Sequence, residues 1–377
     1  MKKSYLMIAA AATLFAACAS DDSFKEIEKQ ERAIGFMPYT GNVTKSAITG
    51  STNEARLASL ADAGGFQVYG YKTTETTNLW TQAASISTIF YETDVTSSDN
   101  GATWSYTGLR FWDKNATYNF YAVAPANPGT STYGIIAPPN ANYGKITISN
   151  VASAKSGDSK DFLIDRNGAT GQLGSNHTGS NNPTVDLEFH HIMAKVEFAL
   201  KSTLTEGKIT VTDLKMSGWN SGIGTFVQDQ TITDTPSGLV HGEWDIETAG
   251  NDVLTLVGSG AGDNSVVLNC NPSATATPIT DWYIMVPQGI DANTLKFTVS
   301  YTYNQIDDKG TESTDDDEIT YTETFTNQEA TVSNQHTWGT DSYTKYTLDI
   351  NPNAIIFDVT SVCGFDIAGA APIIDVK

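Results

Sequence analysis

The sequence predicts an all-β protein made of two antiparallel β-sandwich domains in tandem. Short segments of alternating apolar and polar residues recur along the chain, and turns rich in Gly, Asn, Asp and Ser separate them. Tyr, Phe and Trp make up 10% of the residues and Thr is abundant, which favours strands over helices. About 360 residues follow the apolar leader, a length that favours two domains over one.

Residues 1–17 have the pattern of a lipoprotein signal peptide. Lys2 and Lys3 form a positive n-region, and Tyr5–Ala17 is apolar but too short to cross a bilayer. The small residues before Cys18 resemble a bacterial lipobox, which predicts that the chain is cut before Cys18 and that its thiol is acylated. The acyl chains would then anchor the protein in the membrane. The alternative is an ordinary signal peptide that is cut nearby, with Cys18 incidental.

Residues 18–32 are expected to form an acylated tether. A serine and two aspartates follow closely after Cys18, a run similar to the signal that sends lipoproteins of the Bacteroides group to the outer face of the outer membrane. Residues 24–32 are charged and mostly polar, which predicts a flexible linker. Together these features predict a surface-exposed lipoprotein of the cell outer membrane.

The first sandwich is expected over residues 33–203 and begins with an edge strand. Ala33–Thr40 alternates, with Ile34 and Phe36 on one side and Met37 on the other. Pro38 cannot donate a ladder hydrogen bond, so this strand belongs at the edge of a sheet. Residues 52–63 predict a single short helical turn. Further strands are predicted at Phe66–Tyr71, Ile86–Tyr91, Thr103–Tyr106, Tyr118–Pro125, Lys145–Ser149 and Asp161–Ile164.

One long strand is expected to close this domain. Val185–Leu200 alternates, but the parity of the apolar positions changes near His191, which predicts a bulge or a bend. The loop before it, residues 168–183, is rich in Gly, Ser and Asn, and its length is typical of functional or mobile loops.

The second sandwich is expected over residues 204–377, where short alternating segments separated by polar turns recur. No helix longer than two turns is expected anywhere, and many short strands with polar turns are typical of antiparallel sandwiches. Strands are predicted at Lys208–Lys215, Gly224–Val227, Ser265–Leu268, Trp282–Val286, Leu295–Tyr303, Glu318–Phe325, Tyr343–Ile350 and Ile355–Val359.

Charge and motifs exclude several classes of function. A net charge of -21 argues against a nucleic-acid partner, which needs clustered Lys and Arg. No apolar run after the leader approaches the roughly 20 residues that span a bilayer. His190 and His191 point to opposite faces of a strand and cannot chelate one ion together, so we expect one packed and one exposed imidazole. No hydrolase, zinc-protease or phosphate-loop motif occurs, so neither an enzyme nor a cofactor is predicted.

Three features leave alternatives open. Cys270 and Cys363 form either a disulfide or two buried apolar side chains, and we favour the second. The acidic run 315–318 either holds calcium or is a solvated hairpin tip, and its spacing favours the tip. Four tryptophans either bind sugars or belong to the core, which is their usual place in sandwiches: Trp80, Trp104, Trp112 and Trp219.

The motifs, taken in order, resemble a known family. They are the lipobox at Cys18, AIGFMPYT followed by VTKSA, FQVYGY, the series TWSY, FW and YNFYAVAP, then LEFHHIMAKVEF and the closing QHTWGTDSYTKYTLDINPNAIIFDV. Together they resemble the fimbrillins of Bacteroidales, which are the lipoprotein pilins of type V fimbriae, and their Mfa-like relatives. The resemblance runs over nearly the whole chain. It implies two transthyretin-like sandwiches, a place in a fimbrium, and neighbouring fimbrial subunits as partners.

The resemblance also implies how such a subunit assembles. A trypsin-like protease cuts the anchored pro-form after a basic residue, the first strand leaves, and a C-terminal strand of the neighbouring subunit fills the groove. In this sequence the displaced strand is Ala33–Thr40 and the donor is Phe365–Lys377. The cut falls between Lys45 and Ser46, with Arg32 and Arg56 as weaker choices. A donor from another chain restores the sheet edge, and this head-to-tail contact produces a filament.

Two functions therefore follow from the sequence. The first is a structural subunit of a type V fimbria that polymerises by donor-strand exchange. The alternative is a surface lipoprotein that does not polymerise and acts as a tip or anchor adhesin or as a glycan-binding module. Its partners would be glycans or proteins on host or bacterial surfaces. The aromatic-rich loops and the loop at residues 168–183 motivate it.

Overall fold

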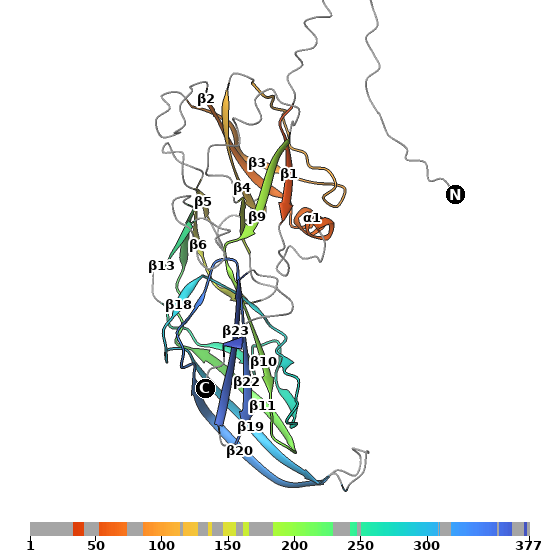
Figure 1. The fold of residues 1–377 in the computed structure, drawn as a ribbon, viewed down its shortest axis with the longest axis vertical. Coiled ribbons are helices and arrows are strands. Elements are labelled where there is room, and N and C mark those ends of the chain that lie inside the picture. The colour runs from red at the N-terminus through yellow and green to blue at the C-terminus, as the bar shows by residue number, and fades with distance from the viewer. Residues whose placement is uncertain are drawn as a thin grey trace, which may run out of the picture.

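The computed structural model is an elongated molecule made mostly of β-strands (Figure 1). It describes residues 33–40, 53–73, 86–113, 116–126, 135–137, 146–155, 161–165, 184–228, 242–246, 250–307, 309, 318–352, 354–363 and 373–374. The predicted all-β class is confirmed at this level. The division into two transthyretin-like domains over residues 33–203 and 204–377 stays a prediction.

A six-stranded sheet forms the part of the molecule drawn uppermost in Figure 1. Its first two strands pair in parallel, and its other neighbours pair antiparallel. In order across the sheet, the strands are β1 (Gly35–Thr40), β9 (Thr184–His191), β8 (Leu163–Asp165), β4 (Thr117–Ala124), β2 (Phe66–Thr73) and β3 (Ser87–Val95).

Strand β2 of this sheet has buried residues on both faces. Alternate residues of β2 belong to different cores, with Phe66 and Val68 in one and Tyr69 and Tyr71 in the other. Between them, Gly70 provides the room that two phenylalanine rings need, because a Cβ there would lie 2.6 Å from the Phe90 ring. The core that contains Tyr69 also receives side chains of a four-stranded sheet, in the order β13 (Gly242–Ile246), β12 (Gly224–Gln228), β6 (Thr147–Val151) and β5 (Ile135–Ala137).

Two further sheets enclose the third core in the lower part of the molecule (Figure 1). The first has seven strands, namely β24 (Ile373–Ile374), β23 (Ala354–Cys363), β22 (Ser342–Asn351), β10 (Ala194–Lys201), β17 (Tyr283–Met285) and β7 (Ala154–Lys155) in order, with β16 (Thr277–Pro278) also paired to β10. The second has β14 (Leu254–Val257), β11 (Lys208–Ser217), β19 (Lys296–Asp307) and β20 (Glu318–Thr331) in order, with β15 (Val266–Asn269) also paired to β11. A two-stranded sheet joins β18 (Gln288–Ile290) and β21 (His336–Trp338).

Strand pairing crosses the predicted domain boundary at residues 203 and 204. β6 pairs with β12, and β7 pairs with β17, so strands from both predicted domains share two sheets. β10, which ends just before the boundary, pairs in parallel with β22. Residues from both sides of this boundary belong to the same two cores.

The expected single strand over 185–200 is wrong in one respect. The chain forms two strands, β9 and β10, in different sheets, with Ile192 and Met193 between them. The buried positions change from odd-numbered to even-numbered residues, and this change explains why the chain forms two strands. Buried odd-numbered residues of β9 (Val185, Leu187, Phe189) belong to the core that contains Phe66, which we call the upper core. Buried even-numbered residues of β10 (Ala194, Val196, Phe198, Leu200) belong to the third core, which we call the lower core.

The expectation of no helix longer than two turns is also wrong. Helix α1 (Asn53–Asp62) has 10 residues, close to three turns. Its sequence contains several good helix formers, and Leu60 is fully buried in the upper core. Gly64 and Gly65 end the helix with positive φ, and their N–H groups donate to Ala61 and Leu60. Neither this helix nor any other in the described residues is long and apolar enough to cross a membrane.

Candidate assembly site: strand β1 and its groove

Strand β1 lies at the edge of the upper sheet, as the sequence predicts. Among the described strands it pairs with β9 alone, in parallel, with Gly35 opposite Thr184 and Thr40 opposite Phe189. Ile34 and Phe36 are buried and Met37 is 56% exposed, so the predicted alternation is confirmed. Pro38 is accommodated because an edge strand has one side without a ladder.

Phe36 is the centre of an aromatic cluster. Four rings surround it edge to face, with centroid distances of 6.5 Å to Phe66, 5.2 Å to Phe90, 5.8 Å to Tyr106 and 5.7 Å to Phe120. Burial of a phenylalanine contributes about 1.5–3 kcal/mol, and well-placed ring pairs add to this. β1 therefore contributes to the hydrophobic core of this sheet.

The segment from Tyr106 to Phe111 holds the start of β1 from the other side. The Ile34 N–H donates to the Arg110 carbonyl at 2.8 Å, and the Tyr106 hydroxyl donates to the Ile34 carbonyl at 2.7 Å. Ala33 and Phe111 form an antiparallel bridge. Burial raises the pKa of Tyr106, which keeps its hydroxyl protonated as a donor. This segment forms the second wall of a groove whose first wall is β9.

The sequence did not identify this second wall. It predicts a strand at Thr103–Tyr106, but the structure has only a single bridge there, between Thr96 and Ser105. The alternation of Trp104 and Tyr106 is the signal that could have identified it, since both side chains pack against the upper core.

A chain without β1 would expose an apolar groove and an unpaired edge of β9. Such an edge is a template for another extended strand, and the apolar floor supplies pockets for every second side chain of that strand. The buried residues that line the site are Phe66, Phe90, Phe120, Val185, Leu187 and Phe189.

The predicted modification and processing residues lie outside the described residues. These are Cys18, Lys45 and Ser46, together with the weaker choice Arg32. The predicted cut falls within residues 41–52, between the end of β1 and the start of α1, and Arg56 lies within α1. Of the predicted donor Phe365–Lys377, only β24 is described, and it pairs antiparallel with β23 at the edge of the seven-stranded sheet.

The histidine pair differs from its prediction, because both imidazoles are buried. His191 Nδ1 contacts the Asp161 carboxylate, and both side chains are almost completely inaccessible. His190 Nε2 lies 3.1 Å from Glu188, and its Nδ1 lies 3.7 Å from Asp341. The sequence missed these carboxylates because two of them are far away along the chain. No group of three metal-ligating side chains occurs among the described residues.

The structure describes part of the cysteines, tryptophans and acidic residues for which the sequence left alternatives open. Cys270 carries a free, half-buried thiol, so a disulfide with Cys363 is absent from this structure. Trp112 and Trp219 are buried and Trp104 is half-buried, which confirms them as core, whereas Trp80 lies outside the described residues. So do residues 315–317 of the acidic run.

Comparison with known proteins gives one family and several similar structures. A family model described as fimbrillin-like matches residues 52–362. The crystal structure of a fimbrial protein from Bacteroides vulgatus is similar, with a TM-score of 0.61, 20% identity, and coverage of 89% of this chain and 100% of that one. A protein from Bacteroides uniformis that is assigned to cell adhesion has a TM-score of 0.44, 11% identity, and coverage of 89% and 99%. A comparison with curated protein sequences found no match.

Proposed function

The chain belongs to the fimbrillin-like family, and from this premise we propose that it is a structural subunit of a type V fimbria. The family is structural and non-enzymatic. In this proposal the chain is exported as a lipoprotein and anchored in the outer membrane through Cys18. A trypsin-like protease then cuts between Lys45 and Ser46, β1 leaves, and the C-terminal strand of a neighbouring subunit takes its place.

The observation that carries the proposal is the position of β1. It is an edge strand whose apolar side fills a groove, and the two sides of that groove come from parts of the chain that follow residue 52. A cut at Lys45 would separate the strand from the domain that it completes. The strand would then be held by noncovalent contacts alone, and another strand could compete for the same groove.

The pairing of β1 also favours exchange. β1 runs parallel to β9, and parallel pairs are slightly less stable per residue than antiparallel ones. A donor that pairs antiparallel with β9 would therefore gain ladder energy while it fills the same apolar pockets. Because the donor belongs to another chain, each exchange leaves one groove and one donor free, which produces a filament.

Mass spectrometry of sheared surface filaments tests this proposal. The expected subunit in the filament begins at Ser46. A polymer whose chains still begin at Cys18 would overturn strand displacement.

Two variants sharpen this test. Lys45→Gln is expected to leave the chain unprocessed and unpolymerised on the surface. Arg56→Gln, which removes a neighbouring basic residue, is the matched control and is expected to leave filaments unchanged. If Arg56→Gln abolishes processing and Lys45→Gln does not, the cut belongs at Arg56.

The alternative function, a glycan-binding lipoprotein that does not polymerise, loses part of its support. It was motivated by aromatic-rich loops and by the loop at residues 168–183, and of the candidate sugar-binding tryptophans Trp112 and Trp219 are buried and Trp104 is half-buried. The same filament experiment separates the two functions, since this alternative requires a monomeric chain that keeps Cys18.

A further inference from the structure

Strand β20 is a second sheet edge, far from β1. It has 14 residues and, among the described strands, pairs with β19 alone. Figure 1 shows the β19–β20 hairpin at the lower end of the molecule, opposite the end where β1 lies. Nearly all residues of β20 are exposed, and the strand contains no Pro, Lys or Arg, which are the residues that commonly protect an edge from pairing.

The regular part of this edge is short and well defined. The register shifts between Val299 and Tyr301 and again between Gln305 and Ile306, and Asn327 has a positive φ near the first shift. Between the shifts, Tyr321–Phe325 pairs without interruption with β19. Bulges interrupt a ladder, and of the parts of β20 that pair in unbroken register, Tyr321–Phe325 is longer than residues 328–331 and residues 318–319.

The side chains of this segment have a distinctive pattern. Tyr321, Glu323 and Phe325 alternate and so lie on one face of the strand. Tyr321 is 50% exposed, and Phe325 stacks on Tyr301 with a centroid distance of 4.8 Å. Glu323 lies between these two aromatic residues and is exposed. This face therefore presents one carboxylate with an aromatic ring on each side.

The opposite face is satisfied within the sheet. Thr324 Oγ1 lies 3.3 Å from Thr302 Oγ1, and Thr322 donates to Asn304 at 2.9 Å. This face offers hydroxyl groups that are already paired, and it provides little to select a partner. The choice of a partner strand therefore depends on the face that carries Glu323.

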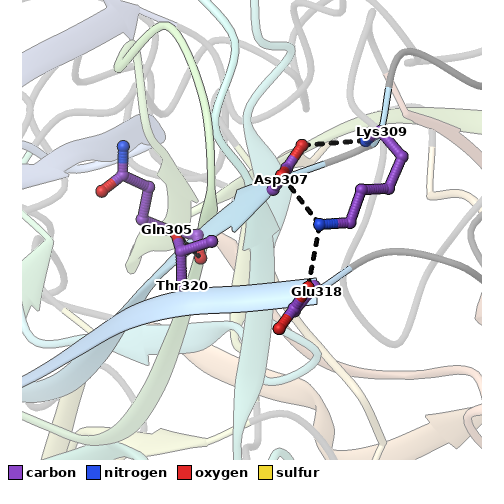
Figure 2. A network of polar contacts seen from close by, with 5 residues as sticks. All are labelled: Gln305, Asp307, Lys309, Glu318 and Thr320. Atoms are coloured by element: carbon purple, nitrogen blue, oxygen red, sulfur yellow. Dashed lines mark hydrogen bonds and ion pairs between the residues drawn. The ribbon is translucent and has the colours of Figure 1, made fainter.

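The lysine nearest the hairpin tip is already engaged. Figure 2 shows Lys309 between two carboxylates, with its Nζ 2.9 Å from Asp307 and 2.8 Å from Glu318. Within the part of the chain that the structure describes, no lysine or arginine pairs with Glu323. The negative charge of Glu323 raises the pKa of the neighbouring Tyr321 hydroxyl, which is a neutral group.

We propose that Tyr321–Phe325 is a docking edge for an extended segment of a partner protein. The partner strand carries Lys or Arg opposite Glu323 and apolar residues two positions to each side. Residues directly opposite each other on neighbouring strands share a face, so the cation meets Glu323 while the apolar residues cover Tyr321 and Phe325. The backbone ladder supplies affinity, and this alternating pattern supplies specificity.

A second copy of this chain does not fit the edge well. β20 carries Glu318, Glu323 and Glu329 and no base, and the whole chain has a net charge of -21. Two β20 strands side by side would bring six carboxylates together, and Lys309 offsets the charge of Glu318 alone. A basic partner is therefore favoured. The inference is independent of the proposed function, because it uses neither β1 nor the cut at Lys45.

Binding of a designed peptide to the full chain tests this edge. The probe is a peptide of alternating Thr and Val in which the central Val is replaced by Lys, and the control peptide has Glu at that position. We expect the Lys peptide to protect the backbone amides of residues 318–331 from hydrogen exchange and to bind more tightly than the Glu peptide. Glu323→Lys is expected to weaken the Lys peptide about five-fold and to reverse the preference, since one cross-strand pair contributes up to about 1 kcal/mol.

Glu243→Lys is the matched control, because Glu243 is an exposed residue on β13, in a different sheet. It makes the same change of charge and is expected to leave the peptide preference unchanged. An unchanged unfolding midpoint for both variants shows that folding is intact, and the reversed preference of Glu323→Lys is a gain that misfolding cannot produce.

Three results would overturn the proposal. They are absence of protection at residues 318–331, equal binding of both peptides to the unsubstituted chain, and a dimer in sedimentation whose contact protects the same residues.

Discussion

Phe36 of β1 and Phe90 of β3 lie edge to face with ring centroids 5.2 Å apart, although they belong to the two outermost strands of one sheet. The contact crosses over the face of the sheet, beside Phe120 of the central strand β4. The strand that is proposed to leave is therefore bound to the middle of the core that remains. Removal of β1 has a large free-energy cost, and only a strand that fills the same pocket can offset it.

The first prediction concerns this contact. Phe36→Ala removes a buried ring from the centre of the aromatic cluster and is expected to lower the free energy of unfolding by about 3–5 kcal/mol. Met37→Ala is the matched control on the exposed side of the same strand and is expected to change it by less than about 0.5 kcal/mol. Denaturant-induced unfolding measures both, and equal losses would contradict the role of Phe36.

The second prediction fixes β1 in place. Met37 and Asp186 are register partners on adjacent strands, and both are exposed. Strands in a sheet lie about 4.8 Å apart, a spacing that a disulfide can bridge. Met37→Cys combined with Asp186→Cys is expected to abolish filament formation under oxidising conditions, even after cleavage at Lys45, and a reductant is expected to restore it. Met37→Cys alone serves as control, and filaments from the oxidised double variant would exclude strand displacement.

The sequence predicts β1 well because the signal is local. Its period of two, together with Pro38, gives the strand, its buried face and its place at an edge, and none of these depends on distant residues. The same reasoning predicts the bend near His191, because the buried positions are odd-numbered in β9 (Val185, Leu187 and Phe189) and even-numbered in β10.

Local sequence patterns do not specify which distant strands pair with each other. No pattern in β6 specifies β12 as its neighbour, and no pattern in β10 specifies β22. The buried state of His191 has the same origin. Local alternation predicts one packed and one exposed imidazole in the histidine pair, and only the fold brings Asp161 beside His191.

The third prediction concerns this buried pair. Asp161→Ala removes the carboxylate that contacts His191 and leaves a buried polar ring without that partner. Loss of one member of a buried pair costs about 3 kcal/mol or more. Asp161→Asn keeps the size and an oxygen acceptor and is expected to cost less. Thermal and denaturant unfolding of the two variants give the comparison, and a loss below about 1 kcal/mol for Asp161→Ala would contradict a stabilising contact with His191.

The fourth prediction concerns pH and His336 at the start of β21. Trp338 Nε1 donates to the Tyr346 hydroxyl at 2.8 Å, and that hydroxyl contacts His336 Nε2. Nδ1 of the same ring lies 3.1 Å from the Asn334 carbonyl. A carbonyl can only accept, so Nδ1 carries the proton and the neutral Nε2 accepts from Tyr346. Protonation of Nε2 would leave the buried Tyr346 hydroxyl without its acceptor.

The direction of the pH effect follows from the pKa of His336. Burial lowers that pKa below the ordinary value of 6.5, against a smaller opposing contribution from the Asn334 carbonyl. The unfolded chain then binds the proton more readily than the folded one. The contribution of His336 to stability is present above about pH 6.5 and is lost as the pH falls through its folded pKa.

The free energy of unfolding, measured between about pH 7.5 and about pH 5, checks this effect against His336→Gln. The variant keeps a hydrogen-bonding side chain but cannot titrate, so the unsubstituted chain is expected to lose more stability over this range than the variant does. Other titrating groups are common to both chains and cancel in the difference. Parallel pH curves would mean that His336 is not the neutral acceptor in the chain of hydrogen bonds from Trp338 to Asn334.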